Sequence, residues 1–365
     1  MKVSNYSEKY NEITKVMLEN FTKGNEGKNL VFSPVSIITL LGMAADSVAG
    51  KAREEIAEFI GGGISFDDVM TVLKRMQKIF TEGGSVVSSN AVCVKKEIRE
   101  TITESYESRL KEIFDGELFS SENIVNDVNE WARVKTKGMI DKVADESLKS
   151  MVACLINAVS FEAEWAEQYE DDDVFEEEFT NADGTKSDVQ MMYSNEDRYV
   201  ENAMFTGFVK PYKDRDYSFM AILPKGESVS FSEKNVKEID FAKMFHESVP
   251  EMVDVMMPEF KYDFSKELTD ICMESGIKTI FTPEADFSPM SSAWLKIDSI
   301  IHKAHMEVDR KGTKAAAVTG ACLCLGCAPH YEAKEVCIDR PFAYAIMNSK
   351  TGLPVFVGVC NCIEE

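Results

Sequence analysis

The sequence predicts an α+β protein in which helices and strands follow one another in mixed order. Stretches of the N-terminal half carry apolar residues at helical spacing, such as Tyr10, Ile13 and Met17. Residues 151–161, in contrast, are apolar at consecutive positions, which is typical of a strand buried on both faces. Because no regular alternation of strand and helix follows, we do not expect a parallel βαβ architecture.

The first half of the chain is predicted to be mainly helical. Ser33 and Pro34 form a helix start, since serine caps the first turn and proline suits its first position. The run Gly61-Gly62-Gly63 is a stop signal. We expect helices over residues 6–21, 34–45, 51–60, 67–80, 103–114 and 123–143, and a strand over 85–94.

The second half is predicted to be richer in strands. Asn157 interrupts the apolar strand at 151–161, and a buried asparagine needs hydrogen-bond partners. Turn-forming residues occupy 181–184. We expect short strands within 189–223, helices over 231–246 and 264–275, and strands over 294–308 and 336–346.

The composition favours one folded domain over residues 1–365. No linker rich in proline, glycine and serine divides the chain, and 44% of its residues are hydrophobic, which is ample for a core. No apolar run reaches the ~18 residues of a transmembrane helix, so we expect no membrane association. The first residues are polar and do not form a signal peptide.

The charge balance excludes classes of partner. The chain has 63 acidic and 40 basic residues, a formal net charge of −23. Such a chain repels phosphate, so we expect no binding to nucleic acid or anionic membranes through bulk charge. Acidic residues gather in 164–178. We expect a solvated surface there, with a cation site as the alternative.

The nine cysteines are an odd number, so they cannot all pair internally. Cys322, Cys324 and Cys327 are spaced like thiolate ligands, with His330 and Cys337 nearby. Zinc sites of that kind need a fourth ligand and tight turns. We expect no metal and no cofactor, and instead exposed thiols that are prone to oxidation.

The most informative stretch lies between the last predicted strands. From Gly312 to Pro329 there is no aromatic side chain and only one charge, Lys314. A long loop of small residues in a compact domain is usually functional, although a flexible linker is the simplest alternative. If the segment becomes a strand, alternate positions share one face and are small enough to enter a packed interior. These positions are Thr313, Ala315, Ala317 and Thr319.

This stretch resembles the hinge of a serpin reactive-centre loop, the named case of a loop that inserts into a sheet. Other motifs resemble serpin signatures and occur in the family's order over almost the whole chain. Each is weak by itself, but the ordered set is specific. They are Asn29–Ile37, Leu155–Ala158 with Phe161 and Trp165, Val189–Met192, Met220–Pro224, Ile301–Ala304, Arg340–Phe342 and Leu353–Gly358.

The resemblance implies a fold and a function. The fold would have three β-sheets, about nine helices and an exposed reactive-centre loop within residues 310–335. The protein would inhibit serine proteases as a suicide substrate and would not itself be an enzyme. After a protease cuts the loop and forms an acyl-enzyme, the hinge would insert into the central sheet and trap the protease.

The resemblance also assigns residues. A hydrogen-bonded cluster under the central sheet, called the shutter, would comprise Ser33, Ser36, Asn157 and His302. Trp165 would lie at the top of that sheet, in the breach, where insertion begins. The hinge would comprise Gly312, Thr313, Ala315, Ala316, Ala317 and Thr319.

Two residues depart from the family pattern. Arg310 and Lys314 stand where serpins usually carry acidic residues. Lys314 should point to solvent when the loop inserts, so its charge is tolerable. Arg310 is expected to lose a family ion pair, which at an exposed site is worth only ~0–1 kcal/mol.

The family register places the scissile bond at Gly326-Cys327, within a window that also includes Cys324, Leu325 and Ala328. Residues 315–331 contain no arginine or lysine. A trypsin-like pocket would keep an unpaired aspartate, so small or apolar pockets are favoured. We expect elastase-like targets, then chymotrypsin- or subtilisin-like proteases.

The protein is expected to act as a monomer, and outside the cell, with any signal peptide absent from this chain and a cytoplasmic location as the alternative. Other functions remain open. A non-inhibitory serpin could bind a ligand or act as a chaperone, although the alanine-rich hinge argues against it. A cross-class inhibitor of cysteine proteases is a second alternative. A cysteine-nucleophile enzyme is a third, but no catalytic signature surrounds any cysteine.

Overall fold

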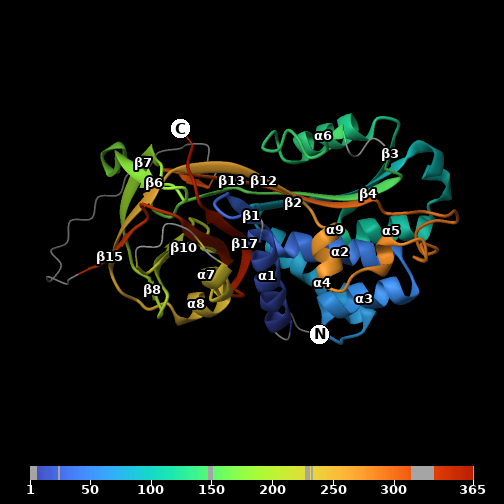
Figure 1. Ribbon diagram of the computed structural model, residues 1–365, viewed down its shortest axis with the longest axis horizontal. Helices are drawn as coiled ribbons and strands as arrows, with labels where there is room; N and C mark the ends of the chain where they lie inside the picture. The colour runs from blue at the N-terminus through green and yellow to red at the C-terminus, as the bar shows by residue number, and fades with distance from the viewer. Residues whose placement is uncertain are drawn as a thin grey trace. The chain divides into compact units, whose positions relative to one another are not determined.

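The computed structural model describes residues 6–23, 25–146, 151–226, 231, 233–313 and 333–364 (Figure 1). Its contacts group into two compact units. The first comprises Met1–Met17, Phe32–Ser160 and Asp263–His305, and the second comprises Leu18–Val31, Phe161–Tyr262 and Met306–Glu365. Each unit draws on distant parts of the sequence, so no single position along the chain separates them.

Most helices precede residue 140. Helix α2 is buried at every position and contacts α3, α4 and α5 (Figure 1). Ser33 caps it as predicted, with its hydroxyl accepting from the backbone N–H of Ser36. The helices in this part of the chain are α1 (Ser7–Thr22), α2 (Pro34–Ser47), α3 (Gly50–Gly61), α4 (Phe66–Thr81), α5 (Glu104–Phe114) and α6 (Ile124–Lys135).

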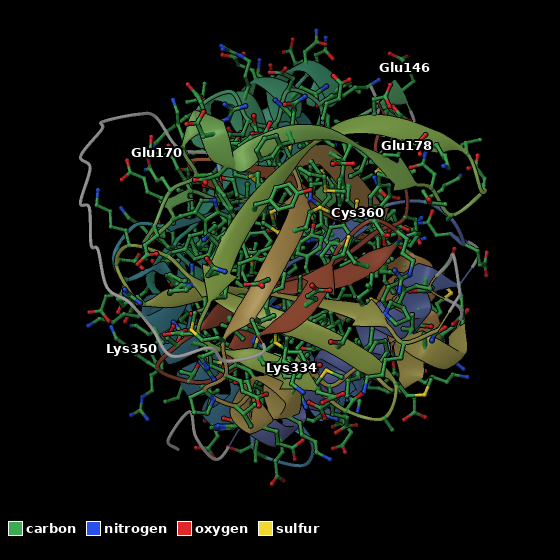
Figure 2. All side chains as sticks on the ribbon, turned by 90° about the vertical axis from the view of Figure 1, so that its left-hand side faces the viewer. Glu146, Glu170, Glu178, Lys334, Lys350 and Cys360 are labelled. Atoms are coloured by element: carbon green, nitrogen blue, oxygen red, sulfur yellow. The ribbon has the colours of Figure 1, made fainter. Side chains whose placement is uncertain are left out.

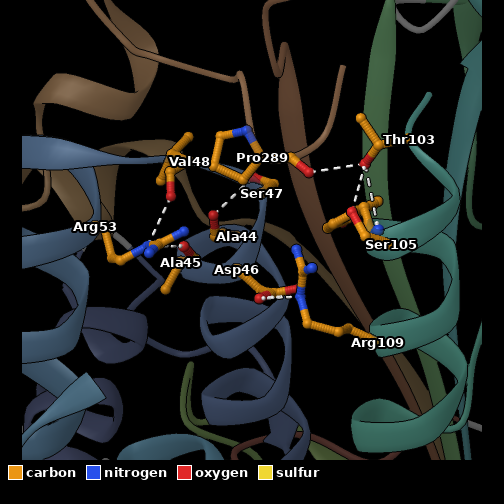
Figure 3. Close-up of polar contacts among 11 residues, drawn as sticks. Ala44, Ala45, Asp46, Ser47, Val48, Arg53, Thr103, Ser105, Arg109 and Pro289 are labelled. Carbon is orange, nitrogen blue, oxygen red and sulfur yellow. Dashed lines mark hydrogen bonds and ion pairs between the residues drawn. The ribbon is translucent and has the colours of Figure 1, made fainter. Parts of the chain in front are cut away.

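The C-terminal end of α2 is held by two arginines (Figure 3). Arg53 donates to the carbonyl oxygens of Ala45 and Val48, which the helix itself leaves without a partner. Arg109, on α5, donates to both carboxylate oxygens of the buried Asp46, at 2.9 and 3.0 Å. These contacts fix α2, which carries two of the predicted shutter residues at its start.

One sheet has its centre in the first unit. Strand β4 (Ala153–Phe161) is buried at every position and pairs in parallel with β13 (Ser299–Asp309), residues 154–159 opposite 299–304. On the side of β4 away from β13 lies β2 (Val86–Lys95), which pairs in turn with β3 (Gly116–Ser121). Helix α6 packs on this sheet through an apolar cluster that includes Cys93, Val128 and Ile156. Further members of the sheet are β12 (Phe260–Glu267), β14 (Gly312–Thr313) and β5 (Ala163–Glu164).

Two more sheets form the second unit. The six-stranded sheet has the order β1 (Leu30–Phe32), β17 (Leu353–Cys360), β16 (Phe342–Asn348), β10 (Tyr217–Pro224), β9 (Phe205–Pro211) and β8 (Tyr199–Glu201). The four-stranded sheet has the order β15 (Lys334–Cys337), β11 (Val253–Pro258), β7 (Lys186–Glu196) and β6 (Val174–Thr180). The remaining helices are α7 (Glu233–Lys237), α8 (Phe241–Glu247) and α9 (Thr269–Glu274).

The predicted α+β class is confirmed, but five predicted elements were wrong in extent, one of them the strand expected over 294–308, which begins only at Ser299. Helix α6 ends before Lys137 and Gly138, whose positive φ angles of 53° and 80° no helix accommodates. Asp240 caps α8, so the helix expected over 231–246 is two short ones. The strand expected over 336–346 is two strands in different sheets: β15 ends at Cys337, and β16 begins at Phe342, directly after Pro341, which has no N–H to donate.

Another of these errors lies at 264–275. Its first residues extend β12, which pairs with β13, and only Thr269–Glu274 is helical. Pairing with a distant strand here overrides the local helical spacing. None of the helices in the described ranges is long and apolar enough to cross a membrane.

Candidate functional site

The predicted hinge begins inside a sheet. Gly312 and Thr313 form β14, which pairs antiparallel with the end of β13 on one side, Thr313 opposite Val308. On the other side β14 pairs antiparallel with β5, Gly312 opposite Glu164 and Thr313 opposite Ala163. The first two residues of the predicted hinge therefore lie between two strands.

Gly312 is required by this close approach. A Cβ atom added there would lie 2.1 Å from the Ala163 carbonyl oxygen and 2.8 Å from the Glu164 Cα, and backbone atoms cannot give way. The turn that leads into Gly312 is held by Asp309. Its carboxylate accepts from the backbone N–H groups of Lys311, at 2.7 Å, and Gly312, at 3.0 Å.

Thr313 is buried against an aromatic pair. Its side-chain oxygen lies 2.7 Å from the Tyr212 hydroxyl, and the Tyr212 ring stacks on Trp165 with centroids 4.6 Å apart. The Trp165 indole N–H donates to the Asp309 carbonyl oxygen at 2.9 Å. The backbone N–H of Trp165 donates to the Lys311 carbonyl oxygen, also at 2.9 Å. Trp165 thus binds the turn that precedes the predicted hinge.

A buried ion pair lies behind Trp165. Lys210 Nζ is 2.7 Å from Glu196 Oε1, and both side chains are less than a tenth exposed. The ammonium group also lies over the rings of Tyr169, at 4.5 Å, and Trp165, at 5.6 Å. Burial raises the pKa of Glu196, although Lys210 opposes that shift. Sequence analysis missed this pair, because nothing marks these two charges among the many surface ones.

Arg310 has ion-pair partners of its own in the structure, and the loss of the family's ion pair at this position stays a prediction. Its Nε lies 3.2 Å from Glu259 and its Nη1 lies 3.0 Å from Asp171. Asp171 belongs to the acidic stretch at 164–178. Since Arg310 is one-third exposed and Asp171 is almost fully so, solvent screens the contact with Asp171.

The predicted shutter residues come together in the first unit. The backbone N–H of Ser33 donates to His302 Nε2 at 3.2 Å, and His302 Nδ1 lies 3.2 Å from Asn157 Oδ1. Because Nε2 accepts, Nδ1 carries the proton and donates to Asn157. Complete burial lowers the pKa of His302 to about 3, so the ring is neutral at physiological pH.

The network continues on β2. The Asn157 amide donates to Ser88 Oγ at 3.1 Å and to Asn90 Oδ1 at 2.9 Å. The Ser36 hydroxyl lies 3.4 Å from that of Ser88. Sequence analysis missed Ser88 and Asn90, because polar residues on a predicted strand carry no signal of their own.

This network spans the line along which β4 meets β13. Asn157 stands directly opposite His302 in the register of the two strands. Their side-chain contact therefore breaks if the strands separate. We call this line, residues 154–159 against 299–304, the seam.

Several predicted residues lie outside the described ones. For the hinge these are Ala315, Ala316, Ala317 and Thr319, and for the reactive bond they are Cys324, Leu325, Gly326, Cys327 and Ala328. Cys322, His330 and Lys314 also fall there. Within the part of the chain that is described, no three His, Cys, Asp or Glu side chains are grouped so as to hold a metal ion.

Comparison with known proteins gives one consistent family. A family model described as Serpin (serine protease inhibitor) matches residues 8–362. An uncharacterized serpin-like protein of Methanosarcina mazei is 28% identical over 353 residues, which cover 91% of this chain and 80% of the relative.

Solved structures agree. The native state of tengpin, a thermophilic serpin, superposes with a TM-score of 0.89 at 29% identity and covers 100% of this chain and 95% of its own. Human thyroxine-binding globulin, complexed with thyroxine, reaches the same TM-score over the full length of both chains, at 22% identity. That second likeness shows the fold alone.

Proposed function

This chain belongs to the serpin family, and we propose that it inhibits serine proteases as a suicide substrate, as a monomer outside the cell. A protease attacks the loop after Thr313 and forms an acyl-enzyme. The freed hinge then inserts between β13 and β4 as a new strand. The attached protease is displaced and distorted before water hydrolyses the acyl-enzyme.

The observation that carries this proposal is the position of β14. Gly312 and Thr313 already pair with strands on both sides, so the residues that follow have a template along which to add. Thr313 is small and faces the interior, where added volume is costly. By the two-residue period of a strand, Ala315, Ala317 and Thr319 follow on the same face.

Insertion replaces the one hydrogen-bond ladder between β4 and β13 with two ladders, one on each side of the new strand. The seam is a parallel pairing, whereas a strand entering from β14 runs antiparallel to both neighbours. Antiparallel pairing is slightly more stable per residue, and the new strand adds its own hydrogen bonds and burial. The cost is the opening of the seam, including the contact of His302 with Asn157. The intact fold is therefore held by a kinetic barrier.

The proposed targets are elastase-like proteases, followed by chymotrypsin- and subtilisin-like ones. Residues 315–331 offer leucine, cysteine, glycine and alanine before the candidate bonds and no basic residue. Trypsin would leave its pocket aspartate unpaired, at a cost of ~1–3 kcal/mol. The cysteines make the rate sensitive to reductant, because a disulfide among them would stiffen the loop.

Incubation with neutrophil elastase and with trypsin, followed by denaturing gel electrophoresis, tests the proposal. We expect a covalent complex with elastase and a released C-terminal fragment. The mass of that fragment should correspond to a chain that begins at Cys327. Cleavage without a complex would show a substrate and favour a non-inhibitory serpin. Faster trapping of trypsin than of elastase would refute the target class alone.

A further inference from the structure

We propose that Cys93 and Cys154 form a disulfide when the chain folds in an oxidising medium, and that this bond ties β2 to β4 beside the seam. The bond would join two strands on the same side of the seam and would not cross it. It would therefore stabilise the fold and leave the seam free to open, whether or not the chain inhibits a protease.

Two contacts fix how β2 and β4 pair. The backbone N–H of Lys95 donates to the carbonyl oxygen of Val152, the residue before β4, at 2.9 Å. The Asn157 amide donates to Asn90 Oδ1, also at 2.9 Å. Between these contacts the residue number rises by five on β2 and falls by five on the β4 side, so the two strands run antiparallel.

This register places Cys93 directly opposite Cys154, two residues along each strand from the contact of Lys95 with Val152. Opposed residues of antiparallel strands have Cα atoms about 4.5–5.5 Å apart, within the range of about 4.4–6.8 Å that disulfides span. Both side chains belong to the apolar cluster on which α6 packs, so they point to the same face of the sheet. The two thiols are free and in hydrogen-bond contact. A bond between them therefore needs little movement of the backbone.

A second pair of cysteines is less well placed. Cys360 lies on β17 in the six-stranded sheet, and Cys362 follows two residues later (Figure 2). Two residues of extended chain separate Cα atoms by about 6.6–6.8 Å, which is the upper limit for a disulfide. The Cys360 thiol instead donates to the Cys362 carbonyl oxygen at 3.7 Å. Proximity in sequence is thus a weaker indication than the opposed register of Cys93 and Cys154.

Burial decides when the bond can form. Both side chains are fully buried beneath α6. Contact with Cys93 and burial raise the pKa of the Cys154 thiol well above its usual range, so the folded chain holds little of its thiolate. Because only a thiolate attacks a disulfide, exchange should be fast while the chain folds and slow afterwards. The same burial would protect the finished bond from reductants.

The oxidant is a small disulfide, such as glutathione disulfide. The thiolate of one cysteine attacks a sulfur atom of the oxidant, whose S–S bond breaks and releases one glutathione thiolate. The thiolate of the second cysteine then attacks the cysteine sulfur of this mixed disulfide and releases the second glutathione. The two cysteines lose two electrons and two protons, and the oxidant leaves as two thiols.

The bond would make β2 and β4 one unit beside the seam. Asn157 is held from both sides, by His302 across the seam and by Ser88 and Asn90 on β2. These contacts compete when β4 leaves β13. A covalent link at Cys154, three residues from Asn157 on the same strand, would keep β4 with β2 and confine opening to the seam.

Refolding from urea in glutathione buffer, once oxidising and once reducing, gives the direct test. Residues 79–95 and 150–186 are tryptic peptides, each with one of the two cysteines and no other. After oxidising refolding we expect a linked pair of these peptides, two hydrogens lighter than their sum, which reduction separates. Unlinked peptides, or Cys93 linked to a different cysteine, would overturn the proposal.

The melting temperature gives a second readout. Wild type refolded with oxidant should melt about 5–10 °C above wild type refolded with reductant, because the bond closes a loop of about 60 residues in the unfolded chain. Cys93→Ala should remove this difference. Cys272→Ala, at a buried cysteine on α9, is the matched control and should keep it. The wild-type comparison needs no substitution, so the test holds if Cys93→Ala folds poorly. Equal melting temperatures of the two wild-type samples would contradict a stabilising bond.

The time at which oxidant is added tests the role of burial. Glutathione disulfide added to the folded, reduced protein should form the bond at least about tenfold more slowly than during refolding. Equal rates would contradict a bond that is set as the chain folds. None of these measurements involves a protease. Their failure would leave the inhibitory function untouched, and a failure to inhibit would leave the disulfide.

Discussion

Acid should weaken this fold through one buried side chain, His302. Its pKa in the folded chain is about 3, against ~6.5 for an unfolded histidine. The unfolded chain therefore binds the proton first as the pH falls. The stabilisation from the neutral ring is complete above pH ~6.5 and is lost down to pH ~3, at ~1.4 kcal/mol per unit. At pH 4.5 the loss is ~2.7 kcal/mol.

The structure gives the reason for the low pKa. Nε2 already accepts from the backbone N–H of Ser33, so a proton on Nε2 would set two donors against each other. Because the ring is fully buried, no water can accept a hydrogen bond from the added N–H either. Charging the ring removes the acceptor of the Ser33 N–H, which links the start of α2 to β13, while Nδ1 still donates to Asn157. Acid should therefore loosen the contact between the start of α2 and β13.

The assay is the urea unfolding midpoint as a function of pH, for wild type and His302→Gln. Glutamine can still accept from Ser33 and donate to Asn157, but it does not titrate. His246→Gln, at an exposed histidine on α8, is the matched control. We expect the difference between wild type and His302→Gln to shrink by ~2–3 kcal/mol between pH 7.5 and 4.5. Parallel curves for the two proteins would refute the reasoning.

Three further predictions concern the hinge, the loop and the turn that precedes them. Thr313→Arg and Ala315→Pro should each raise the stoichiometry of inhibition, since they bury a charge or remove a ladder donor; an unchanged stoichiometry in both would contradict insertion. Loop cleavage should raise the melting temperature strongly because the sheet gains a strand, and a cleaved form that melts at or below the intact one would show that no insertion occurs. Arg310→Ala should lower the free energy of urea unfolding by under ~1 kcal/mol, since its ion pairs are partly exposed; a loss of several kcal/mol would mean that the turn depends on it.

Local signals in the sequence predicted local structure well. Ser33 and Pro34 mark the start of α2, because capping and the fixed φ of proline act within one turn. The apolar run of β4 predicted its burial on both faces. The meeting of Asn157 with His302 could be expected only from the family resemblance, since no pattern in the sequence relates two residues so far apart.

Contacts between distant segments account for what the sequence did not reveal. Phe264 has the spacing of a helix, but β13 offers a hydrogen-bonding edge to its strand. Lys210 and Glu196 look like surface charges until the fold buries them together. Arg310 pairs with Glu259 and Asp171, which lie far from it in sequence. Such pairings depend on tertiary packing, which overrides local propensity.

The two residues of β14 change the kinetics of the proposed trap. Starting a strand is slow, because distant segments must meet in the correct register before any contact rewards the lost entropy. Here Thr313 is already aligned with Val308 and Ala163, so nucleation is complete before any protease arrives. A slip by one residue would turn every following side chain to the wrong face, and this alignment prevents it. Only elongation of the strand remains, and its rate competes with the rate at which water hydrolyses the acyl-enzyme.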